Sequence, residues 1–137
     1  MAFKPIQFDS GKMVEKEFAT GVTVVKGNAV VDNGSGYLTN ASASTAVDVR
    51  YVAAEGLTTT ANGDLVLCWM TDGVTFEADT DAAWSVTDVN TDVDLGTAGN
   101  LNPDASTHDL FHIERGVGTA ETDTKVIGHF TRGVPNS

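Results

Sequence analysis

One stretch constrains the fold of this chain more than any other: GDLVLCWMTDGVTFEA, residues 63–78. It places Asp72-Gly73 between two runs of strand-forming residues, and this dipeptide in that setting predicts a β-hairpin with a two-residue turn. In such a hairpin Trp69 lies opposite Phe76, so the bulkiest side chains share one face of the sheet. We therefore expect residues 63–78 to form the central hairpin of a β domain, with that face toward the core.

The opposite face of the same hairpin has a mixed character. Its first strand carries Val66, Cys68 and Met70, whereas its second strand carries Thr75 and Glu77. A surface of this kind is too apolar for open solvent and too polar for a dry core, so it suits partial cover by another element or by another subunit. Val66, Cys68 and Met70 are therefore the predicted subunit interface.

Length and composition indicate a single all-β domain. The chain has 137 residues, enough to bury a core without disulfides or a metal. Its richness in Gly, Thr, Val, Asp and Asn favours strands and turns over long helices. Cys68 is the only cysteine, so an internal disulfide is not possible.

The charge of the chain disfavours two classes of partner. Nineteen acidic side chains against eight basic ones give a net charge of -11, which repels phosphate backbones and anionic bilayers. The sequence begins without an apolar signal segment, and no apolar run approaches the ~18 residues of a membrane helix. We expect a soluble protein, made in the cytoplasm, that binds neither nucleic acid directly nor a membrane.

The rest of the chain reads as strands joined by turn-rich loops. The sequence DNGSG, residues 32–36, tolerates positive φ and predicts a second hairpin. Apolar and polar residues alternate over residues 46–53, which is typical of a half-buried strand. Residues 79–105 are expected to form a long, turn-rich segment that contains one irregular strand. The last two strands are expected to form a hairpin that closes the sheet. The predicted strands outside the central hairpin are residues 22–25, 29–32, 37–39, 46–53, 110–114 and 125–130.

The N-terminal region differs from this pattern. Pro5 argues against a regular helix or central strand near it, and residues 1–12 show no sustained period. Residues 1–20 are therefore predicted to form an extended arm beside a single β domain of residues 21–137. The apolar side chains of the arm either pack on the parent domain or dock on a neighbouring protein; they are Phe3, Ile6 and Phe8.

The segment DVNTDVD, residues 88–94, is one candidate metal site. Its oxygen ligands stand at alternate positions, as at the start of an EF-hand loop. Val93 then occupies the position that needs glycine for the turn, and Gly99 occupies the position that needs a bidentate glutamate. The segment therefore does not predict a calcium site.

The histidines are the other candidate. His112 and Glu114 share one face of a predicted strand, and the final hairpin places His129 on the neighbouring strand. A zinc site needs three or four converging ligands, whereas two histidines on a sheet are more often surface residues. The sequence therefore predicts neither a metal nor a cofactor.

No catalytic signature accompanies these residues. His108-Asp109 beside many Ser and Thr residues suggests a catalytic triad, but the sequence has no nucleophile elbow, Walker loop or dinucleotide glycine pattern. We expect the protein not to be an enzyme, with Trp69 and Trp84 as core anchors.

Several segments together resemble a known class of protein. They are the N-terminal arm, VVKGNAVVDNGSGYL in the second hairpin, the Trp-bearing central hairpin, the phrase TDVDLGTAGNLN, and FHIERG followed by KVIGHF in the last hairpin. In their order along the chain and in their local sequences, these segments resemble small capsid decoration, or cement, proteins of tailed bacteriophages.

The resemblance implies a small β-barrel or β-tulip-like sandwich on the exterior of the capsid in the virion, as a trimer that bridges subunits of the major capsid protein and stabilises the shell. It assigns capsid binding to the arm residues Phe3, Lys4, Ile6, Phe8, Lys12 and Lys16. One alternative is a small β-barrel module whose mouth, near His112 and His129, holds a glycan or a cation. Another is a different virion component, such as a head-fibre or tail protein.

Overall fold

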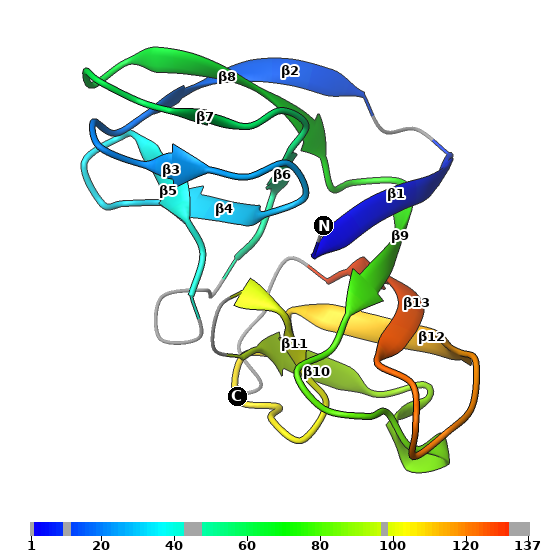
Figure 1. Ribbon diagram of the computed structural model, residues 1–137. Helices are drawn as coiled ribbons and strands as arrows, with labels where there is room; N and C mark the ends of the chain where they lie inside the picture. The colour runs from blue at the N-terminus through cyan, green and yellow to red at the C-terminus, as the bar shows by residue number, and fades with distance from the viewer. Residues whose placement is uncertain (1, 10–11, 43–47, 97–98, 132–137) are drawn as a thin grey trace.

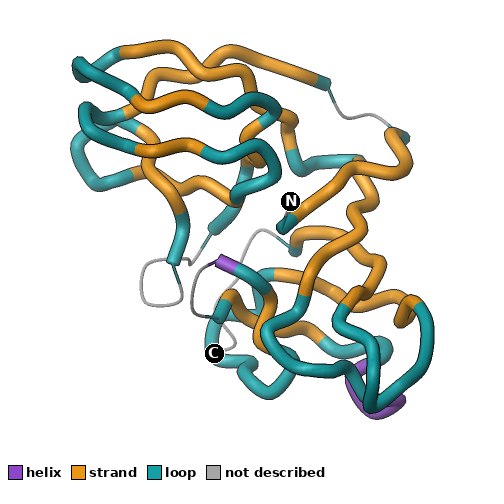
Figure 2. Tube along the Cα trace, in the orientation of Figure 1, coloured by secondary structure: helices purple, strands orange, loops and turns teal. Residues whose placement is uncertain are grey.

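The computed structural model describes the whole chain except residues 1, 10–11, 43–47, 97–98 and 132–137. The described part is nearly all β and forms one small domain, as the sequence predicts. It contains a closed barrel, a six-stranded sheet and a small two-stranded sheet. The barrel and the six-stranded sheet stand as two lobes, and both ends of the described chain lie on the side of the six-stranded sheet (Figures 1 and 2).

The barrel is continuous in sequence and runs in the order β2-β5-β4-β6-β8 before it closes. Its strands are β2 (Met13–Phe18), β4 (Ala29–Asp32), β5 (Leu38–Asn40), β6 (Tyr51–Ala53) and β8 (Asp64–Met70). The predicted second hairpin is confirmed, because β4 and β5 pair antiparallel. Its turn is held by local side-chain contacts: the Gly34 amide donates to Asp32 Oδ1 at 2.6 Å, and the Ser35 amide donates to Asn33 Oδ1 at 2.8 Å.

The six-stranded sheet takes one strand from residues 3–8 and five from residues 74–130, in the order β1-β9-β13-β12-β10-β11. These strands are β1 (Phe3–Phe8), β9 (Val74–Asp79), β10 (Asp92–Leu95), β11 (Leu101–Asn102), β12 (Phe111–Val117) and β13 (Lys125–Phe130). The predicted final hairpin is confirmed by the antiparallel pairing of β12 with β13. The remaining elements are β3 (Thr23–Val24), its partner β7 (Leu57–Thr58), and a 3-10 helix η1 (Val86–Asp88).

The predicted central hairpin is wrong in its strand pairing, although its turn forms. The Val74 amide donates to the Thr71 carbonyl across Asp72 and Gly73 at 3.3 Å. Of the two turn residues only Gly73 has a positive φ, +69°. The two-residue turns that keep hairpin strands together need a positive φ at the first position, and other turns splay the strands apart. β8 therefore joins the barrel, whereas β9 joins the six-stranded sheet.

Because β8 and β9 lie in different sheets, the side chains of β8 also face differently from the prediction. Val66 and Cys68 are completely buried inside the barrel, whereas Leu65 is 52% exposed and Trp69 is half-buried. On β9 the predicted inward face is confirmed, since Phe76 is completely buried. A face shared by both strands, on which the predicted subunit interface depended, does not exist.

The prediction of a separate arm over residues 1–20 is corrected as well. β1 pairs antiparallel with β9, and β2 pairs antiparallel with β8 over its whole length. Phe3 is completely buried, and its ring centroid lies 4.8 Å from that of Phe130 and 5.8 Å from that of Phe111. Pro5 is compatible with β1 because this strand lies at the edge of its sheet, where a missing N–H group is tolerated.

Two apolar clusters form the core. The larger one joins the lobes: it contains the four rings of Phe3, Phe76, Phe111 and Phe130 together with barrel residues such as Val52. The smaller cluster fills the barrel and includes Phe18, Val30, Leu38, Val66 and Cys68. Since the larger cluster draws on both lobes, they fold as one domain.

Candidate functional site

Three exposed apolar side chains stand on the second half of β1 and at the first residue of β2. Ile6, Phe8 and Met13, which we call the β1–β2 corner, are 43%, 49% and 47% exposed. The register of β1 against β9 shifts between Pro5 and Gln7, so Ile6 stands at an irregularity of the strand. Exposed apolar residues at the edge of a sheet are suited to contact another protein.

The six residues assigned to capsid binding therefore separate into three groups. Phe3 belongs to the core. Lys4, Ile6, Phe8 and Lys12 lie on the surface around the β1–β2 corner. Lys16 points into the barrel lobe, where its Nζ lies 5.0 Å from the centre of the Tyr51 ring.

The residues predicted to form the subunit interface are mostly out of reach of another subunit. Val66 and Cys68 are completely buried, and Met70 is half-buried beside a small cavity of about 70 Å³ that Arg50 and Tyr51 also line. Burial, followed by the charge of Glu55, raises the pKa of the Cys68 thiol to about 12, against a smaller opposing effect of Lys16. Cys68 is thus a neutral core side chain.

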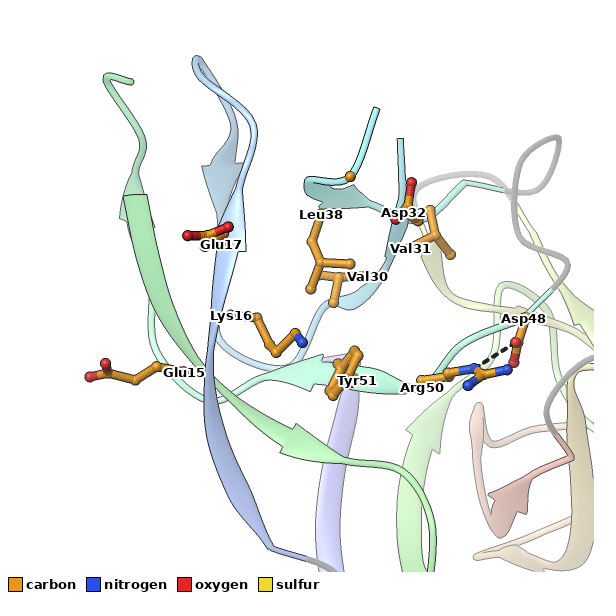
Figure 3. Close-up of a pocket in the computed structure, with 11 residues that line it drawn as sticks. Glu15, Lys16, Glu17, Val30, Val31, Asp32, Leu38, Asp48, Arg50 and Tyr51 are labelled. Atoms are coloured by element: carbon orange, nitrogen blue, oxygen red, sulfur yellow. Dashed lines mark hydrogen bonds and ion pairs between the residues drawn. The ribbon is translucent and has the colours of Figure 1, made fainter. Parts of the chain in front are cut away.

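A hollow that we call the barrel mouth opens at the side of the barrel. It has a volume of about 530 Å³ and is bordered by β2, β4, β5 and β6 (Figure 3). β2 and β5 close the barrel through one residue pair, Phe18 with Leu38, and the strands diverge beyond it. This divergence leaves Val30, Leu38 and Tyr51 as an apolar floor, with the Lys16 ammonium over it and the Arg50–Asp48 ion pair, 2.8 Å long, at its border.

The sequence reasoning missed this barrel mouth. Its signal is the alternation of β2, in which Val14, Lys16 and Phe18 share the more buried face and Glu15 and Glu17 face outward. A lysine between two apolar residues on the inward face marks a place where the barrel admits a charged group.

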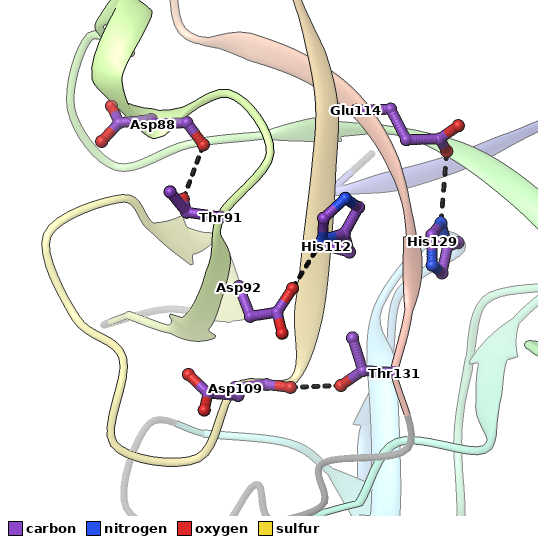
Figure 4. Close-up of polar contacts among 8 residues, drawn as sticks. All are labelled: Asp88, Thr91, Asp92, Asp109, His112, Glu114, His129 and Thr131. Atoms are coloured by element: carbon purple, nitrogen blue, oxygen red, sulfur yellow. Dashed lines mark hydrogen bonds and ion pairs between the residues drawn. The ribbon is translucent and has the colours of Figure 1, made fainter. Parts of the chain in front are cut away.

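The mouth does not lie near His112 and His129, where the ligand-module alternative placed it. These residues are partners across β12 and β13 in the six-stranded sheet, with ring centroids 5.2 Å apart. His112 Nδ1 contacts Asp92 Oδ1 at 2.6 Å, and His129 Nδ1 contacts Glu114 Oε2 at 3.3 Å (Figure 4). The part of the chain that the structure describes holds no group of three or more His, Cys, Asp and Glu side chains arranged to bind a metal.

The acidic segment 88–94 uses its carboxylates to hold backbone. Asp88 accepts a hydrogen bond from the Ser85 amide at 2.7 Å and so fixes the start of η1. Asp94 is 5% exposed and accepts three amide hydrogen bonds at 2.7–2.8 Å, which fasten the loop before β12. The donors are Thr107, His108 and Asp109. The two carboxylates serve different loops and do not converge on a common ligand position.

Among the described residues, no helix has the length and apolar character needed to span a membrane. Neither the family models nor the curated proteins include a match to this chain. One solved structure matches over most of both chains: the crystal structure of the N base of head fiber gp8.5 in bacteriophage phi29. The TM-score is 0.58 at 16% sequence identity, and the match covers 89% of this chain and 97% of the other. The chain therefore has the fold of that head-fibre base.

Proposed function

We propose that this protein is a structural component of a tailed-phage virion that binds the outer surface of the capsid and bridges subunits of the major capsid protein. The observation that carries the proposal is the shared fold with the base of a phage head fibre, which extends over 89% of this chain. The role of a decoration protein and the role of a head-fibre base both require this attachment.

The β1–β2 corner is the surface that we assign to capsid contact. Three large apolar side chains, Ile6, Phe8 and Met13, are about half exposed there. β9 is the single partner strand of β1 within the described residues. On the other edge the Phe3 amide donates to the Gly27 carbonyl at 2.9 Å and Pro5 has no N–H, so the part of this edge after Pro5 offers backbone groups to a neighbouring strand. An extended capsid segment that adds to this edge gains both hydrogen bonds and apolar contacts.

Attachment of this kind stabilises a shell through linkage. A protein at a free concentration one hundred times its Kd contributes about 2.7 kcal/mol per site to the state that it binds. Many copies act on the same shell, and a trimer that spans several capsid subunits joins them to one another. Bridging thus needs no enzymatic activity, in keeping with the role that we propose.

Co-sedimentation with capsids that lack this protein tests the proposal. The wild-type chain is expected to sediment with the capsids, and the double variant I6D/F8D is expected to stay in the supernatant, because two charges replace the apolar contact. V86D is the matched control, since Val86 is 72% exposed on η1, away from the corner. Absence of wild-type sedimentation would count against the virion role, whereas equal binding of wild type and I6D/F8D would show that the contact lies elsewhere.

A further inference from the structure

Two histidines face each other on the six-stranded sheet. His112 and His129 occupy opposite positions on β12 and β13, and their rings are tilted by 37° with centroids 5.2 Å apart. Their side chains are 29% and 49% exposed, so an ion can reach both from solvent.

Each ring is held by its own carboxylate. Asp92 Oδ1 lies 2.6 Å from His112 Nδ1, and Glu114 Oε2 lies 3.3 Å from His129 Nδ1 (Figure 4). A neutral imidazole that donates its Nδ1–H to a carboxylate keeps the lone pair on Nε2, where it can bind a metal. The two carboxylates therefore select the metal-binding tautomer of both rings.

The spacing of the rings fits one shared ion. With metal–nitrogen distances of about 2.0 Å and a tetrahedral angle, two imidazoles bound through Nε2 have centroids about 5 Å apart. The observed 5.2 Å matches this separation.

The surroundings favour a cation. Asp92 and Asp94 lie close enough to Asp109 to raise its pKa, after the larger effect of burial. Negative potential at this end of the sheet attracts positive ions, and the whole chain carries a net charge of -11.

We propose that His112 and His129 form a binding site for one divalent transition-metal ion, with Zn²⁺, Ni²⁺ and Cu²⁺ as the class of ligand. The Nε2 atoms bind the ion, water completes its coordination, and Asp92 and Glu114 orient the rings. Imidazole nitrogen suits these metals, whereas Mg²⁺ and Ca²⁺ prefer oxygen ligands. With two protein ligands, the affinity is lower than that of a structural zinc site.

The test uses the full chain without a polyhistidine tag at 150 mM salt, titrated separately with ZnCl₂, NiCl₂, CuCl₂ and MgCl₂. The melting temperature is expected to rise with at least one of the three transition metals and to stay unchanged with MgCl₂. H112A and H129A are each expected to abolish the rise, and H108A is the matched control that keeps it. D92N and E114Q are expected to weaken metal affinity by about 10- to 100-fold.

NMR of the wild-type imidazole nitrogens gives a second readout that does not depend on the folding of any variant. Addition of Zn²⁺ is expected to shift the Nε2 resonances of His112 and His129 and to leave those of His108 in place. The proposal is overturned if no transition metal raises the melting temperature at millimolar concentration. It is also overturned if H112A and H129A bind the metal as the wild type does, or if Zn²⁺ shifts His108 alone.

Discussion

The indole ring of Trp84 fills the space that a side chain at Gly116 would occupy. A Cβ at Gly116 would overlap the six-membered ring of Trp84. The indole Nε1–H also donates to the Val117 carbonyl at 3.1 Å. These contacts attach the loop after β9 to β12. They are possible only because Gly116 has no side chain.

Gly116→Ala is expected to destabilise the protein by about 1–3 kcal/mol, the usual cost of inserting a methyl group into a filled space. Urea unfolding monitored by circular dichroism measures the change. In a Trp84→Leu background the same substitution should cost less, because the smaller side chain leaves room for the methyl group. An equal cost in both backgrounds would contradict the assigned contact.

Two phenylalanines of β1 offer a matched comparison of core and surface. Phe3 is completely buried among aromatic rings, whereas Phe8 is 49% exposed. Phe3→Ala is expected to cost about 3–5 kcal/mol, and Phe8→Ala well under 1 kcal/mol. Chemical unfolding of both variants measures the difference. If Phe3→Ala proved as mild as Phe8→Ala, β1 would not belong to the core.

The buried thiol should be inert in the folded protein. Because burial raises the pKa of Cys68 to about 12, the thiolate is scarce at pH 8. A thiol reagent such as DTNB is expected to react slowly with native protein and at once after unfolding in guanidinium chloride. The variant C68S/V86C, whose thiol stands at a 72% exposed position, should react at once in the native state. Rapid native reaction of Cys68 would place it at an accessible surface.

Asp109 should make stability fall as the pH rises. Burial raises the pKa of its carboxyl above the ordinary 3.8, and the charges of Asp92 and Asp94 raise it further, against the opposing effect of His108. The folded state therefore binds this proton more tightly than the unfolded chain, and the resulting stability is present below pH 3.8 and lost as the pH rises through the folded pKa.

Asp109→Asn removes this dependence and keeps a residue that tolerates the observed φ of +53°. Its melting temperature is expected to match that of the wild type near pH 3 and to exceed it at pH 7. Asp9→Asn controls for the change in net charge at an exposed position. A difference between Asp109→Asn and wild type that stays constant from pH 3 to pH 7 would contradict the titration of Asp109.

The sequence predicted well those strands whose neighbours are close in the chain. β4 and β13 begin and end where the apolar runs do, and their hairpins with β5 and β12 form as expected. In these cases the turn residues and the alternation of side chains both predict the same strand pairing, because the two strands that pair are joined by a short loop.

Pairing over long distances escaped the sequence reasoning. The turn at Asp72 and Gly73 was identified, but which strands flank it depends on β1 and β2, which offer alternative edges to β9 and β8. Local patterns around Pro5 gave no sign of this competition. The barrel mouth was missed for the same reason, since it exists where β2 and β5, which are distant in sequence, diverge.

The pairing of β1 with β9 has a consequence for the order in which the protein is made. The whole barrel lies between these two strands in the sequence, so Phe3 leaves the ribosome long before Ala78, the residue opposite it. At about 5–20 residues per second the first strand waits roughly 4–15 s for its partner to be synthesised. The phenylalanines of β1 are exposed to solvent or to a chaperone during that interval, so β1 reaches its final position only after β9 has been synthesised.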